Sequence, residues 1–181
     1  STTTEEKSLP TIGIVVPGRF IPPTNGGQRV CYDLCSALAK KTRVLCFSAH
    51  TELTLHGLSL FPLYSTSRLH YLNITLVVKL ARELKKHNIK SCIVNQPFFV
   101  FVAFLACRLA RCQLITYAHN LEFKRSEGQR RYLTPLVFLL EMAAFHLSQR
   151  VFFISSQELA EARRRFHLDK DRCILVPHIA N

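Results

Sequence analysis

Short apolar runs alternate with longer amphipathic segments along most of the chain. The first run, residues 12–17, is continuously apolar, as expected of a strand that is buried on both faces of a parallel sheet. Further strands are expected at residues 43–48, 58–63, 91–95, 113–117, 151–154 and 173–176. The run at 58–63 is the weakest of these, because Pro62 removes a backbone hydrogen-bond donor from the strand.

The segments between the strands repeat their apolar residues every three or four positions, as amphipathic helices do. Helices are expected at residues 28–40, 68–87 and 98–109, within 130–147, and from a cap at Ser155 to Phe166. Pro135 fits the first turn of the fourth helix, with Thr134 as its cap, and Ser155 with Glu158 fits a capping box.

This alternation predicts an α/β fold: a doubly wound, Rossmann-like parallel sheet in a single domain, with helices on both faces. We expect the domain to span residues 11–181 and the polar residues 1–10 to form a disordered tail. In such sheets ligands bind at the carboxyl ends of the strands, in the loops that lead into helices. Two polar loops have that position, residues 18–27 and 118–129, so we expect the functional site at this edge.

The net charge of +12 is concentrated in one part of the chain. Residues 34–121 contain eleven lysines and arginines against only Glu52 and Glu83. Such an imbalance predicts an anionic partner: phosphates, acidic lipid headgroups or nucleic acid. Nucleic acid is the weakest of the three, because no stacking-aromatic motif accompanies the charge. We therefore expect no nucleic-acid partner.

Cysteines and histidines give no sign of a metal site. The seven cysteines form no C-x-x-C pair, and the eight histidines show no ligand spacing. We expect reduced core thiols in a cytoplasmic protein, with no metal and no cofactor. The start of the chain does not fit a signal peptide, and no apolar run reaches the roughly 18–20 residues that a membrane span needs. A dehydrogenase is disfavoured, because the G-x-G-x-x-G fingerprint is absent.

The first polar loop contains consecutive glycines, Gly26 and Gly27. Without a Cβ atom, glycine lets a ligand come close to the backbone. The helix that follows offers N–H groups and the positive end of its dipole, which favour an anion such as phosphate. Arg19 and Arg29 flank the pair and can add positive charge. The alternative is that the two glycines only turn the chain.

The second loop brings His119, Asn120, Glu122 and Arg125 to the end of a strand. A histidine there can donate or accept a hydrogen bond near neutral pH. Simpler readings stay open. His119 can be an ordinary loop residue, Asn120 can cap a turn, and Glu122 can pair with Arg125 on one helical turn.

Three segments, in this order, resemble the N-terminal domain of GT-B glycosyltransferases of family 4. They are PPTNGGQRV with the helix ending SALAKKTRVLCFS, then YAHNLEFKRSEGQRRY, then RVFFISSQELAEARRRF followed by ILVPHIAN. The resemblance runs from about residue 11 to the last residue, although PHIAN departs from the more usual Pro-Asn-Gly-x-Asp.

The resemblance implies a hexosyltransferase-like enzyme that uses a UDP- or GDP-sugar, retains the anomeric configuration and needs no metal. It implies that Gly26 and Gly27 approach the donor diphosphate and that His119 is catalytic. The acceptor-binding or supporting residues would be Asn120, Glu122, Arg125, Arg19 and Arg29.

In that family the first domain mainly binds the acceptor, a sugar or a lipid-linked sugar, while a second domain holds most of the nucleotide. The resemblance therefore implies a fragment without its donor-binding domain, inactive by itself and compatible with a peripheral location at the membrane. A non-catalytic alternative also fits the charge: a basic α/β module that docks on anionic membranes or on a protein partner. The basic segments 68–87 and 124–131 motivate that alternative.

Overall fold

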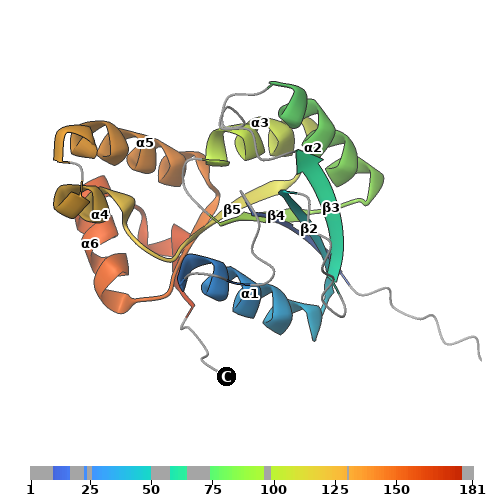
Figure 1. Ribbon diagram of the computed structural model, residues 1–181, viewed down its shortest axis with the longest axis horizontal. Helices are drawn as coiled ribbons and strands as arrows, with labels where there is room; N and C mark the ends of the chain where they lie inside the picture. Colours follow the sequence, from blue (N-terminus) through green and yellow to red (C-terminus); the bar gives the residue numbers. More distant parts are fainter. Residues whose placement is uncertain are drawn as a thin grey trace, which may run out of the picture.

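The computed structural model describes residues 10–16, 23, 26–49, 58–64, 74–95, 99–129 and 131–176 (Figure 1). Its strands are β1 (Thr11–Val15), β2 (Arg43–Ala49), β3 (Leu58–Tyr64), β4 (Ser91–Val94), β5 (Gln113–Ala118), β6 (Arg150–Phe153) and β7 (Cys173–Leu175). They form one parallel sheet in the order β3-β2-β1-β4-β5-β6-β7. The order reverses between β1 and β4, so the prediction of a doubly wound sheet is confirmed.

Helices cover both faces of the sheet (Figure 1). They are α1 (Gly26–Ala39), α2 (Ile74–Lys86), α3 (Val100–Ala110), α4 (Glu122–Gln129), α5 (Thr134–Leu147) and α6 (Ser156–Phe166), with 3-10 turns η3 (Arg131–Leu133) and η4 (Lys170–Arg172). One face carries α1, whereas α2, α3 and α5 lie on the other. Helices α4 and α6 pack with α5 beside β6.

The continuous apolar runs arise because the central strands are buried on both sides. In β1, Ile14 packs with the α1 cluster and Val15 packs with α2 and α3, as the alternation of side chains along a strand requires. Pro62 is tolerated because β3 lies at the edge of the sheet, and the β2–β3 register shifts after Ser48, which pairs with Pro62.

Three local expectations were wrong. Helix α1 begins at Gly26, so the glycines form its first turn instead of preceding it. The expected loop 118–129 contains a helix, α4. Thr134 is the first residue of α5 and not its cap; Leu133 has the cap position and makes no side-chain cap bond. Pro135 does lie in the first turn, as expected.

The thiols belong to the core, as the sequence predicts. Six of the seven cysteines are buried, Cys173 is partly buried, and none forms a disulfide. In α1 the buried positions are Cys31 and Cys35. No helix among the residues described here is long and apolar enough to cross a membrane.

Candidate functional site

Three polar features gather at the carboxyl edge of the sheet. The first turn of α1 lies there because α1 runs back from this edge to the start of β2. Asn95 follows β4, and His119 with Asn120 follows β5. This edge includes the reversal of strand order between β1 and β4, where ligands bind in doubly wound sheets.

The start of α1 is open around Gly26. A Cβ atom added to Gly26 would have no heavy atom within 4 Å. Amides in the first turn of a helix have no partner within the helix, so this terminus can donate to an anion. The side chain of Arg29 is 60% exposed, and its Nε lies 3.2 Å from Oδ1 of Asp33. Its charge is therefore partly compensated on the same helix. Arg19 lies outside the described residues.

Asn95 is a buried polar residue that the sequence analysis did not select. It is 3% exposed, and its backbone N–H donates to the carbonyl of Val15, 3.1 Å away, which ties β4 to β1. Its side chain also hydrogen-bonds the thiol of Cys31 on α1. Its Oδ1 has no hydrogen-bond partner among the described residues. A buried carbonyl oxygen without a donor is costly, so Oδ1 is a candidate to accept from a ligand.

His119 lies two residues after Tyr117, at the end of β5. Tyr117 is 3% exposed and packs in the cluster that contains Cys31 of α1. Burial lowers the pKa of His119, and the nearby charge of Arg125 lowers it further. The imidazole is therefore neutral near pH 7 and has one donor and one acceptor nitrogen.

Glu122 and Arg125 form a pair on α4, as the simpler reading of their spacing predicts. Arg125 Nη1 lies 3.9 Å from Glu122 Oε2. Burial raises the pKa of Glu122, and Arg125 opposes that effect. Because Arg125 also acts on the pKa of His119, the structure brings these three charged or titratable groups together. Asn120 is exposed in the same turn.

Glu141 anchors this turn from α5. Its carboxylate is fully buried and accepts from the backbone N–H groups of Glu122, at 2.9 Å, and Phe123, at 3.1 Å. Burial raises the pKa of Glu141 to about 7, although both backbone bonds oppose it. Burial also raises the pKa of Glu158, and the backbone N–H of Leu121 opposes that rise. The Glu141 carboxylate therefore occupies two successive amides at the start of α4.

The sequence analysis did not select Glu141. A single acid within the otherwise apolar stretch LVFLLEMAAF was the available signal, because a buried carboxylate needs donors. Of the capping box predicted for Ser155 and Glu158, the structure shows only the bond to the Ser155 side chain. Ser155 does cap α6 by accepting from the N–H of Glu158, at 3.5 Å. The Glu158 carboxyl instead lies near the backbone N–H of Leu121, just before α4, which lowers its pKa against the effect of burial.

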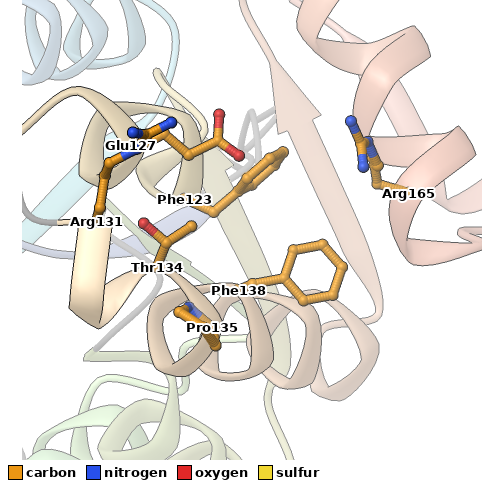
Figure 2. Close-up of a pocket in the computed structure, with 7 residues that line it drawn as sticks. All are labelled: Phe123, Glu127, Arg131, Thr134, Pro135, Phe138 and Arg165. Carbon is orange, nitrogen blue, oxygen red and sulfur yellow. The ribbon is translucent and has the colours of Figure 1, made fainter.

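A separate cavity of about 520 Å³ lies where α4, α5 and α6 meet (Figure 2). Its lining residues are Phe123, Glu127, Arg131, Thr134, Pro135, Phe138 and Arg165. Arg165 is already paired with Glu161, at 3.0 Å. None of the residues selected as candidate site residues lines this cavity, so it stands apart from the candidate site.

Comparison with known proteins gives a family model and a set of solved structures. The model described as Glycosyltransferase Family 4 matches residues 24–180. No curated protein sequence matches the chain significantly.

Among the solved structures, Anabaena Alr3699/HepE in complex with UDP-glucose is 14% identical, with a TM-score of 0.66 over 94% of this chain and 44% of that one. Sucrose-phosphate synthase from Thermosynechococcus elongatus is 14% identical, with a TM-score of 0.72 over 93% and 48%. The lipopolysaccharide outer core galactosyltransferase WaaB is 12% identical, with a TM-score of 0.59 over 91% and 45%. The chain thus spans just under half the length of these structures. At such identities the likeness concerns the fold.

Proposed function

The chain belongs to Glycosyltransferase Family 4 and has the Rossmann-like domain of a GT-B fold, and we propose that it forms the acceptor-side wall of a glycosyltransferase active site. The proposed reaction transfers a hexose from a UDP- or GDP-sugar to a sugar or lipid-linked acceptor, with retention of configuration. The similar solved structures are longer than this chain. A second domain in a longer protein would hold the nucleotide. The observation that carries this proposal is the convergence of Gly26, Asn95 and His119 at one edge of the sheet.

The reaction needs a site for growing negative charge. When the glycosidic bond of a nucleotide sugar breaks, the diphosphate leaves with additional charge on its oxygens. Donors fixed beside those oxygens stabilise the transition state more than the ground state. In this proposal the amides of Gly26 and Gly27 are such donors, because nothing within 4 Å would meet a side chain at Gly26. Arg29, and Arg19 from the preceding segment, add long-range positive charge.

His119 faces the reacting sugar in this proposal. A neutral imidazole can accept from a sugar hydroxyl and donate to a phosphate oxygen, and burial keeps His119 neutral near pH 7. Asn95 can accept from a second hydroxyl through its unpartnered Oδ1. Asn120 and Arg125 lie in the same turn and are proposed to contact the acceptor, while Glu122 holds the Arg125 side chain.

Gly26→Ala in the full-length enzyme tests this proposal, with Gly128→Ala as its matched control. Both glycines are exposed helical residues without any heavy atom within 4 Å of an added Cβ. Each change should raise stability by up to about 1 kcal/mol, because alanine favours a helix more than glycine. Only Gly26→Ala places a methyl group where we propose that the diphosphate approaches.

Steady-state kinetics with UDP-glucose, UDP-galactose, UDP-N-acetylglucosamine and GDP-mannose would identify the donor and then compare the variants. UDP-sugars come first because Alr3699/HepE was solved with UDP-glucose. We expect Gly26→Ala to reduce kcat/KM at least tenfold, while Gly128→Ala keeps it. Equal kinetics in the two variants would show that Gly26 only starts a helix. No transfer from any donor would favour the non-catalytic module.

A further inference from the structure

Exposed apolar side chains are concentrated on one side of the molecule. The most exposed large apolar residues in the described part of the chain are Ile74, Val78, Leu105, Leu109, Tyr132, Leu136, Leu139 and Leu175. Seven of these eight lie on α2, α3, η3 or α5, and only Leu175 lies elsewhere, on β7. Exposed apolar residues are ordinary when scattered, but a cluster on neighbouring helices marks an interaction surface.

Four leucines form the centre of this surface, and we call them the leucine face. Leu105 and Leu109 are four residues apart on α3, and Leu136 and Leu139 are three apart on α5, so each pair lies on one side of its helix. Their exposed fractions are 48%, 54%, 55% and 54% respectively.

The two helices turn the leucine face away from the sheet. In α3 the buried Ala103 and Ala106 point to the core, and in α5 Ala144 does so. Helices α3 and α5 contact each other and cover the same face of the sheet (Figure 1). The exposed leucines of both helices therefore project from the same side of the molecule.

The elements that carry the leucine face are cationic. Arg108 and Arg111 are exposed at the end of α3, Arg131 is exposed on η3, and α2 presents further cations. Only two acidic residues occur in the described α2, α3, η3 and α5. Glu83 is partly buried near Lys86 and His87, and Glu141 is fully buried. The surface is thus apolar and cationic, with no exposed carboxylate on those elements.

We propose that the leucine face docks on an anionic lipid bilayer, with the leucines in the interface and Arg108 and Arg111 at the headgroups. Apolar side chains on cationic elements suit this partner, because acyl chains and acidic headgroups meet at that depth. Tyr132, 80% exposed next to Arg131, has the amphipathic ring that favours the membrane interface. A second copy of the chain is a poorer partner, since the same cations would face each other. This docking does not depend on sugar transfer.

Tryptophan scanning tests the insertion directly, because the chain has no tryptophan of its own. Leu105→Trp places a fluorophore on the leucine face, and Leu175→Trp places one at a similarly exposed leucine on β7. We expect Leu105→Trp emission to shift to the blue, and to be quenched by brominated lipid, with phosphatidylcholine vesicles that contain phosphatidylglycerol. Leu175→Trp should not respond. Equal responses at the two positions would overturn the proposal.

Vesicle sedimentation of the unlabelled chain separates the apolar and electrostatic contributions. The double variants Leu105→Gln/Leu109→Gln and Leu136→Gln/Leu139→Gln should each lower the partition coefficient at least tenfold, whereas Leu175→Gln should not. Each arginine removed should lower it about fivefold, the equivalent of about 1 kcal/mol at an acidic surface. Arg108→Glu/Arg111→Glu is compared with Lys40→Glu/Lys41→Glu, which makes the same charge change at the end of α1 on the other face.

Sedimentation velocity and thermal unfolding of every variant complete the test. We expect a folded monomer throughout, with binding that falls as salt is raised. Wild-type binding by both glutamine double variants would overturn the proposal, as would the absence of binding to acidic vesicles. An oligomer that Leu105→Gln/Leu109→Gln dissociates, without any vesicle binding, would assign the face to a second copy. None of these outcomes bears on the Gly26→Ala kinetics, so failure of docking and failure of the transfer proposal are distinguishable.

Discussion

Glu141→Gln should remove a pH dependence of stability that the buried carboxylate creates. Burial, together with the neighbouring carboxylates of Glu122 and Glu158, raises the pKa of Glu141 from its ordinary 4.5 to about 7. The two backbone N–H donors limit the rise but do not cancel it. Glutamine keeps the shape and one acceptor oxygen but cannot ionise.

The sign follows from the direction of the pKa change. Because the pKa of Glu141 is higher in the folded chain, its contribution is fully present below pH 4.5 and is lost as the pH rises through 7. A change from 4.5 to about 7 corresponds to about 3.5 kcal/mol, at about 1.4 kcal/mol per pKa unit. About 2.5 kcal/mol of this falls between pH 5 and pH 8.

Urea unfolding at several pH values between 5 and 8 measures this effect. Other groups titrate alike in both proteins, so the free energy of unfolding of the wild type minus that of Glu141→Gln should fall by about 2.5 kcal/mol across the range. Glu161→Gln is the control, because Arg164 and Arg165 lower the pKa of Glu161. Its contribution is present at neutral pH and is lost only as the pH falls below 4.5. If the difference in free energy of unfolding between the wild type and Glu141→Gln stayed constant from pH 5 to pH 8, the reasoning would be refuted.

Three further predictions concern activity and packing. His119→Ala in the full-length enzyme should lower kcat by about 10²–10³ without changing the melting temperature by more than a few degrees, since one contact at a charged transition state is lost; unchanged kcat would remove His119 from the site. The 181-residue chain incubated with the four nucleotide sugars and simple acceptors should give no product by mass spectrometry, and transfer would show that no second domain is needed. Leu80→Ala, at a fully buried position, should cost about 2–5 kcal/mol in urea unfolding. Val78→Ala, half-exposed on the same helix, should cost far less, and similar losses would contradict the packing described for α2.

The fold was readable from the sequence because most of its strands are buried on both faces. Continuous apolar runs such as the one containing Ile14 and Val15 occur only where both sides of a strand are covered. The edge strand β3 was harder to recognise because it contains Pro62. Proline is acceptable in an edge strand, and the sequence does not state which strand lies at the edge. Helix α4 was missed because EFKRSEGQ is polar and short, and the contacts that hold it are made with distant parts of the chain: the Glu141 carboxylate at its start and the packing of Phe123 against α5 and α6.

The geometry of the candidate site was only partly readable, for a related reason. Gly26 and Gly27 begin α1, and His119 follows β5, where sequence spacing carries information. The interactions of Glu141 with the amides of Glu122 and Phe123 depend on how α5 packs against α4, which no local pattern encodes. The unpartnered oxygen of Asn95 is likewise a product of burial between neighbouring elements.

Helices α1 and α4 both begin at this edge but differ in what they can bind. The start of α4 has Glu122 in its first turn, and the carboxylate of Glu141 accepts from two of its amides. An anion there would have to displace a buried carboxylate and would meet like charge, which is unfavourable. The start of α1 has no acidic residue in its first turn and has open space at Gly26. Electrostatics therefore favour α1 for the diphosphate of a donor and leave the α4 side, with His119 and Asn120, for neutral hydroxyl groups. The same division gives the buried acid behind α4 its role: its oxygens accept from the amides of the helix terminus that lies on the sugar side of the proposed site.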